Sequence, residues 1–228
     1  MPLFLSTQDP DFELRFQALL GLKREEAEDV DQAVAAIIAD VRARGDAAVI
    51  ELTAKFDRTH LTPETLAFSP DEIAQECAKV SAADRVALEL AAERIRAYHS
   101  RQMPQDAQWT DAVGAELGWR WTPVSAAGLY VPGGIASYPS SVLMNAIPAH
   151  VAGVQDIIMV VPTPHSEKNA LVLAAAYIAG VSRAFTIGGA QAVAAMAYGT
   201  ATVPRVDKIT GPGNAYVAAA KRRVFGTV

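Results

Sequence analysis

Apolar residues in the first hundred positions recur at helical spacing. Between Val30 and Val41 they are separated by three or four positions, which places them on one face of a helix. Asp29 or Asp31 would supply an acidic first turn, and Gly45 would end the helix. The pattern predicts a helix that begins near residue 30.

Three further helices are predicted in the same region from their start signals. Asp46 caps a helix that runs to Phe56. Ser69 precedes Pro70, and a proline in the first helical turn costs no hydrogen bond. Ser81 opens the last of the three helices. The first part of the chain is therefore expected to be helical.

The second part of the chain alternates between short apolar runs and helix-length segments. It begins with a polar stretch that contains Trp109, Trp119 and Trp121, for which no element is predicted. The apolar runs are 126–131, 157–161, 184–187 and 208–210, and the helical segments are 140–152, 167–179, 190–198 and 214–223. This alternation is typical of βα units. It predicts an α/β fold, in which an N-terminal helical region is followed by a Rossmann-like, mostly parallel sheet with flanking helices.

Composition and charge exclude several classes of protein. Of the 228 residues 51% are hydrophobic, so the chain is no disordered segment and can bury a core. No apolar run approaches the roughly 20 residues of a membrane span. The net charge of −5 argues against nucleic acid as a partner.

The charge is unevenly distributed along the chain. Residues 1–104 carry 19 acidic and 12 basic side chains, whereas residues 105–228 carry 6 and 8. The second region is therefore better suited to an anionic small-molecule ligand. Alternatively, exposed helices simply carry more charge than buried strands.

The N-terminus and the cysteine content indicate a cytoplasmic protein. The first 16 residues turn acidic too early for a signal peptide and lack the arginine-rich character of a transit peptide. The single cysteine, Cys77, cannot form an internal disulfide, which favours a reducing compartment. Cys77 has neither a nearby histidine nor CxxC spacing, so a nucleophilic or metal-binding role is not expected.

Glycine-rich turns follow the first, third and fourth predicted strands, at residues 131–134, 188–191 and 211–214. Ligands of parallel sheets bind beyond the carboxyl ends of the strands, and the helix N-terminus after each turn offers free N–H groups to a phosphate. We expect these turns, on three adjacent strands, to converge on a nucleotide. None of them matches the GxGxxG or P-loop pattern, and glycines also serve merely to make tight βα connections.

Three polar side chains accompany these turns. Tyr130 ends the first strand, Gln191 lies in the first turn of a helix, and Asn214 is placed to cap another helix. Together, a phenol and two amides could stack on and hydrogen-bond a nucleotide base and ribose. Taken singly, Gln191 could be a helix surface residue and Asn214 a simple N-cap.

Several long motifs resemble the histidinol dehydrogenases. They are GLYVPGG at 128–134, SYPSSVLM at 137–144, IGGAQAVAA at 187–195 and VDKITGPGNAYV at 206–217. More loosely, ARGDAA at 43–48 and KFD at 55–57 resemble the helical leader of that family. The resemblance thus extends over the whole chain.

This resemblance implies a zinc-dependent oxidoreductase of histidine biosynthesis. Such an enzyme takes L-histidinol through L-histidinal to L-histidine and transfers two hydrides to two NAD⁺. The resemblance also implies a homodimer. The NAD-contacting positions of the family match Tyr130, Gln191 and Asn214 residue by residue.

Members of the family are roughly twice as long as this chain, and the resemblance places their zinc ligands and acid/base pair beyond residue 228. No catalytic or metal-binding residue is therefore assigned here, and His60, His99, His150 and His165 are not expected to bind metal. Residues 1–104 are expected to form the helical region, and residues 105–228 an incomplete Rossmann-like domain that carries the NAD-side loops. One hypothesis is a truncated histidinol dehydrogenase that is inactive alone and self-associates through uncovered apolar surface. The alternative is a non-catalytic remnant of the family that binds a nucleotide or a partner.

Overall fold

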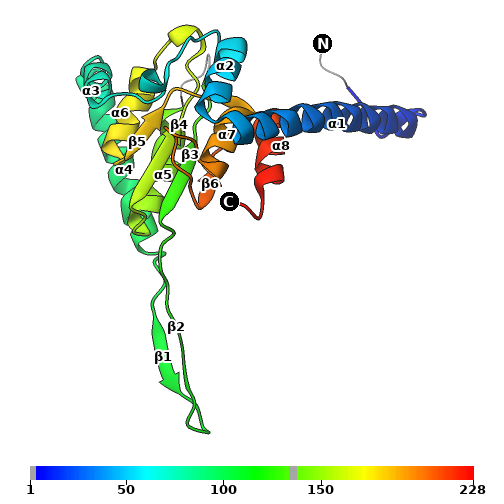
Figure 1. The fold of residues 1–228 in the computed structure, drawn as a ribbon. Coiled ribbons are helices and arrows are strands. Elements are labelled where there is room, and N and C mark those ends of the chain that lie inside the picture. Colours follow the sequence, from blue (N-terminus) through cyan, green and yellow to red (C-terminus); the bar gives the residue numbers. More distant parts are fainter. Residues whose placement is uncertain (1–3, 134–137) are drawn as a thin grey trace.

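The centre of the molecule is a sheet of four parallel strands. The computed structural model describes residues 4–133 and 138–228, and its strands lie in the order β5–β4–β3–β6 (Figure 1). The strands are β3 (Ala126–Tyr130), β4 (Asp156–Val160), β5 (Arg183–Phe185) and β6 (Lys208–Thr210). The parallel α/β prediction is confirmed. The prediction that the three glycine-rich turns follow adjacent strands is wrong, because β4 lies between β5 and β3.

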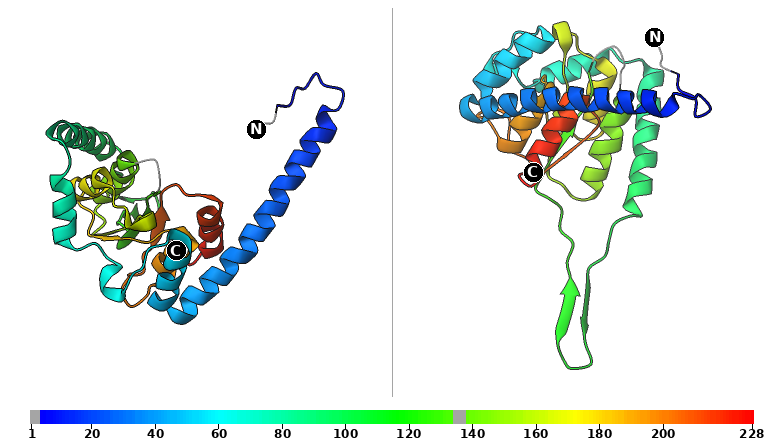
Figure 2. Two further views of the ribbon diagram at one scale, coloured as in Figure 1. Left: turned by 90° about the horizontal axis from the view of Figure 1, so that it is seen from above. Right: turned by 90° about the vertical axis from the view of Figure 1, so that its right-hand side faces the viewer.

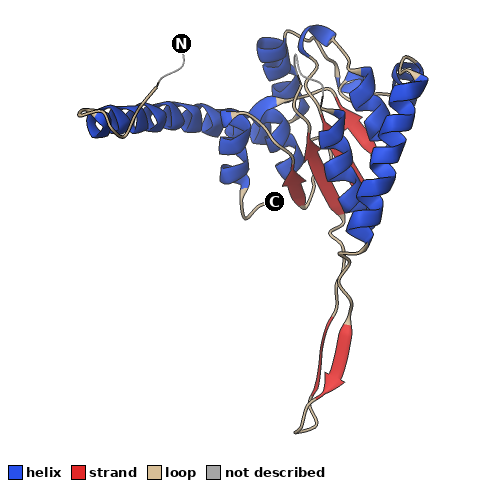
Figure 3. Ribbon diagram, turned by 180° about the vertical axis from the view of Figure 1, so that it is seen from behind, coloured by secondary structure: helices blue, strands red, loops and turns tan. Residues whose placement is uncertain are grey.

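Helices cover both faces of this sheet (Figures 1 and 3). One face carries α1 (Phe12–Arg44), α2 (Asp46–Asp57), α7 (Gly189–Tyr198) and α8 (Ala215–Val224). The other face carries α3 (Pro70–Ala78), α4 (Ala82–Ser100), α5 (Pro139–Val151) and α6 (Ala170–Ile178). Two single 3₁₀ turns, η1 (Pro63–Thr65) and η2 (Pro164–Ser166), complete the described helical structure.

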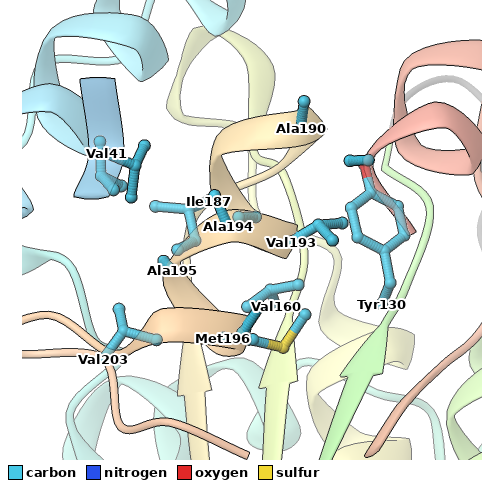
Figure 4. Close-up of a cluster of buried hydrophobic side chains, with 14 of the residues drawn as sticks. Val41, Tyr130, Val160, Ile187, Ala190, Val193, Ala194, Ala195, Met196 and Val203 are labelled. Atoms are coloured by element: carbon cyan, nitrogen blue, oxygen red, sulfur yellow. The ribbon is translucent and has the colours of Figure 1, made fainter. Parts of the chain in front are cut away.

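Alternation along the strands builds a separate core on each face of the sheet. In β4, Ile157 and Met159 are buried against α4, α5 and α6, and Ile158 and Val160 are buried on the opposite side. In Figure 4, Val160 of β4 lies beside Met196 of α7 on that opposite side. Because the strands are buried on both faces, their sequences are continuous apolar runs.

The predicted helix starts at Ser69 and Ser81 are confirmed. The Ser69 hydroxyl accepts a hydrogen bond from the Glu72 amide at 3.1 Å, and the Glu72 carboxylate accepts one from the Ser69 amide at 2.8 Å. The Ser81 hydroxyl accepts from the Asp84 amide at 3.1 Å. Side-chain acceptors therefore satisfy free N–H groups at both helix starts.

The predicted start of the first helix near residue 30 is wrong, because α1 begins at Phe12. The preceding sequence carries Phe12, Phe16, Leu19 and Leu20 at helical spacing, a signal that the prediction did not use. The C-terminal half of α1 packs on α7 and α8, and its N-terminal half extends beyond the body of the molecule (Figure 2).

The polar stretch with three tryptophans forms an antiparallel hairpin that projects from the body (Figures 1 and 2). Its strands are β1 (Ala107–Thr110) and β2 (Glu116–Trp119), and the rings of Trp109 and Trp119 meet edge to face at 5.1 Å. Most of its side chains are exposed, so the hairpin lacked the apolar alternation that predicts a strand. Across the described residues, no helix has both the length and the apolar character needed to cross a membrane.

We predict that Leu129→Ala in β3 lowers the free energy of unfolding by about 3 kcal/mol, because Leu129 is 0% exposed and its loss leaves a cavity. The matched control is Leu90→Ala in α4, where the leucine is 53% exposed and a change within about 0.5 kcal/mol is expected. Urea unfolding followed by circular dichroism measures both values. Equal losses in the two variants would show that the sheet is not the core.

Candidate functional site

A cavity of about 880 Å³ lies at the carboxyl edge of the sheet. Its wall includes the last residue of β3, the N-terminal ends of α5, α7 and α8, and the C-terminal end of α2. Tyr130, Gln191 and Asn214 all line it. The structure therefore brings the three sequence-predicted side chains to one cavity.

Tyr130 fixes the start of α7. Its phenol oxygen accepts a hydrogen bond from the Gly189 amide at 3.0 Å, and Gly189 has a φ of +64°, which favours glycine. Burial raises the pKa of the Tyr130 phenol, and the nearby Asp57 carboxylate adds to the rise. Because the oxygen accepts from Gly189 and stays protonated, the phenol proton remains available to a ligand.

Gln191 is 1% exposed, so the alternative of a helix surface residue is wrong. A Cβ atom built on Gly189 would lie 2.6 Å from Gln191 Oε1, which shows that the amide lies over that glycine. The absence of a side chain at Gly189 thus gives the Gln191 amide its place in the cavity wall.

Asn214 does cap α8, as the simplest interpretation of the sequence predicted. Its Oδ1 accepts a hydrogen bond from the Val217 amide at 3.1 Å. A carboxamide also carries an NH₂ group, which Oδ1 capping leaves as the donor that can reach a ligand. Capping and ligand contact are therefore compatible at this residue.

The turns at this edge meet around Pro162, which follows β4. A Cβ atom on Gly133 would lie 2.2 Å from the Pro162 carbonyl oxygen, and one on Gly188 would lie 2.5 Å from Pro162 Cβ. Any side chain at either glycine would push the turns apart. This close packing brings the N-terminal ends of α5 and α7 to the same cavity, where their partial positive charges favour an anion.

Asp57 and Lys55 also line the cavity, and the sequence analysis did not assign them a role there. Asp57 is the last residue of α2, its Oδ2 is buried, and no hydrogen-bond partner lies among the described residues. Burial raises the pKa of this carboxyl group. The only signal in the sequence was the KFD motif at 55–57, which the resemblance placed in a helical leader.

The described residues do not form a metal site. Within 4–133 and 138–228, no three His, Cys, Asp or Glu side chains gather closely enough to hold a metal ion. Cys77 is buried outside the cavity, and burial raises the pKa of its thiol, which opposes thiolate formation.

The fold and the cavity together define an α/β protein of the doubly wound class, with its ligand cavity where parallel strands end. A family model described as "Histidinol dehydrogenase" matches residues 22–228. The chain belongs to the histidinol dehydrogenase family, as the motifs indicated.

Individual relatives agree with this assignment. The chain is 72% identical to histidinol dehydrogenase of Cereibacter sphaeroides, over 100% of this chain and 52% of that protein. It is 70% identical to the Ruegeria pomeroyi protein of the same name, over 100% of this chain and 53% of that protein. The crystal structure of histidinol dehydrogenase from Elizabethkingia anophelis matches with a TM-score of 0.82 and 35% identity, over 86% of this chain and 45% of that one. The chain thus spans about half the length of the curated relatives it matches.

We predict that Tyr130→Phe lowers the free energy of unfolding by about 1 kcal/mol, because the Gly189 amide loses its acceptor. Tyr177→Phe in α6 serves as the matched control, since that tyrosine is exposed and should tolerate the change. Urea unfolding of both variants gives the comparison. If the two variants are equally stable, the phenol does not hold the start of α7.

Proposed function

We propose that this chain forms the NAD⁺-binding half of a histidinol dehydrogenase. The proposed reaction oxidises L-histidinol through L-histidinal to L-histidine and reduces two NAD⁺. The observation that carries the proposal is the meeting of Tyr130, Gln191 and Asn214 in one cavity at the ends of parallel strands. Family membership supports the choice of reaction.

The chemistry of the cavity suits a dinucleotide. Helix N-termini offer backbone N–H groups to the diphosphate, and a phenol with two carboxamides offers donors and acceptors to ribose and base. The Gln191 amide lines the cavity and would hydrogen-bond a nucleotide bound there. When bound, NAD⁺ supplies the acceptor for a hydride. The role of these residues is to hold and orient it.

We propose zinc only as a cofactor of the family and not as a ligand of particular residues in this chain. The part of the chain that the structure describes offers no set of metal ligands, so no residue and no reaction step is assigned to the metal here. We assign no acid or base to this chain, because the resemblance places that pair of the family beyond residue 228. We propose instead a division of roles, in which residues 1–104 form a helical region and residues 105–228 carry the NAD-side loops in a cytoplasmic enzyme.

The alternative function is a non-catalytic protein of the same family that binds a nucleotide or a partner. The observation that supports it is the cavity, whose wall the described residues form and which could hold a nucleotide without any turnover. Both functions allow the chain to bind a nucleotide. They differ in whether the chain is part of an enzyme that turns over L-histidinol.

We predict that NAD⁺ binds to the purified chain and that Gln191→Met and Asn214→Ser each raise its Kd about fivefold to tenfold, as expected for a lost hydrogen bond. Methionine keeps the length of the Gln191 side chain, and serine keeps the cap of α8, so that each change removes mainly an amide. Isothermal titration calorimetry gives the three Kd values.

Gln75→Met, on the exposed surface of α3 and outside the cavity, is the control and should leave the Kd unchanged. Absence of NAD⁺ binding by the unaltered chain would contradict the proposed function. Incubation with L-histidinol, NAD⁺ and Zn²⁺ then tests whether residues 1–228 turn over by themselves. We expect residues 1–228, as they stand, to give no NADH, and NADH formation would show that they are catalytically complete.

We also propose that the chain self-associates as a homodimer. The hairpin exposes Trp119 and Trp121, and the projecting N-terminal part of α1 exposes Leu14, so apolar surface lies on two extensions of the body. Multi-angle light scattering is expected to give a mass above the 24.2 kDa of one chain. A uniform monomer over a range of concentrations would contradict this proposal.

A further inference from the structure

One carboxyl group in the cavity has no role in the contacts described so far. Asp57 ends α2 and lines the same cavity as Tyr130. The Asp57 carboxyl and the Tyr130 phenol thus face the same space, and the negative charge of Asp57 adds to the rise in the pKa of the phenol that burial causes.

Among the described residues, no hydrogen-bond donor and no cation pairs with the Asp57 carboxylate. Its Oδ2 is buried and accepts no hydrogen bond from residues 4–133 or 138–228. The neighbouring Lys55 ammonium lies 5.3 Å from the centre of the Phe56 ring, and no ion pair joins it to Asp57. The carboxyl is also at the C-terminal end of a helix, where the helix dipole disfavours negative charge. A half-buried carboxyl group that lines a cavity and has no donor of its own can accept hydrogen bonds from a ligand bound there.

The wall of the cavity therefore has two parts that differ in electrostatic character. The N-terminal ends of α5, α7 and α8 make one part of its wall favourable for phosphate. The end of α2 with Asp57 makes another part favourable for hydrogen-bond donors and unfavourable for a second anion. A dinucleotide offers a diphosphate to the first part and ribose hydroxyls to the second.

We propose that Asp57 determines nucleotide specificity: its carboxylate accepts hydrogen bonds from the hydroxyls of the adenosine ribose and excludes a nucleotide that carries a 2′-phosphate there. This inference rests on the proposed function, since it requires that the cavity binds a nicotinamide dinucleotide. Acidic residues fill this role in dinucleotide-binding folds, where they accept from the 2′-hydroxyl of NAD. Here the acid comes from a helix that precedes the sheet in sequence, rather than from the end of a second strand.

The test compares Asp57→Asn with the unaltered chain in titrations with NAD⁺, NADP⁺ and ADP-ribose. Asparagine keeps the shape of the side chain and removes the charge. We expect the Kd for NAD⁺ and for ADP-ribose to rise about tenfold, as for a lost charged hydrogen bond, and the preference for NAD⁺ over NADP⁺ to fall at least tenfold. Asp57→Ser provides a second, smaller variant with the same expected change in preference, and thermal unfolding verifies that each variant folds.

Asp71→Asn, at an exposed position of α3 outside the cavity, is the matched control and should leave both Kd values and their ratio unchanged. If the unaltered chain binds NAD⁺ and the Asp57 variants keep its Kd and its preference over NADP⁺, the inference is overturned while the proposed function stands. If the unaltered chain binds no NAD⁺, the proposed function itself fails. Weaker binding of L-histidinol by the variants with an unchanged nucleotide preference would assign the carboxylate to the amine of that compound and would also overturn the inference.

Discussion

Parallel pairing of four strands is the constraint on which the cavity depends. Because β5, β4, β3 and β6 run in the same direction, each following turn emerges at one edge of the sheet, whatever its distance in sequence. Residues 130, 191 and 214 meet there for that reason. The intervening strand β4 ends in Pro162, against which the turns after β3 and β5 pack without any room for a side chain at Gly133 or Gly188.

Once the turns are at one edge, a few contacts fix their conformations. The Tyr130 phenol accepts from the Gly189 amide and thereby joins the end of β3 to the start of α7. After β6, the Lys221 ammonium donates to the Gly211 carbonyl oxygen at 2.5 Å and holds this turn against α8. Burial lowers the pKa of Lys221, because desolvation disfavours the charged ammonium. The turns that line the cavity therefore have largely fixed conformations before a ligand binds, so less conformational entropy is lost on binding.

Helices from the N-terminal region are part of this architecture. α1 and α2 pack on α7 and α8 and complete the core on one face of the sheet, and α2 brings Asp57 to the cavity. Two extensions, the hairpin β1–β2 and the first half of α1, lie away from this core (Figure 2). The chain spans about half the length of its curated relatives, and within that half one cavity is lined by the N-terminal ends of α5, α7 and α8 and by Asp57.

The sequence by itself determined the local structure and the family. Helical spacing, serine caps and the βα alternation predicted most elements, because these signals depend on neighbouring residues, and the turns identified Tyr130, Gln191 and Asn214. The hairpin escaped prediction because most of its side chains are exposed, and the start of α1 was missed because the helical spacing of Phe12, Phe16 and Leu19 was not used. Strand order, the burial of Gln191 and the approach of Asp57 to Tyr130 were decided only by tertiary packing. They depend on contacts between segments that are distant in the chain, and no local pattern encodes which of those segments come together.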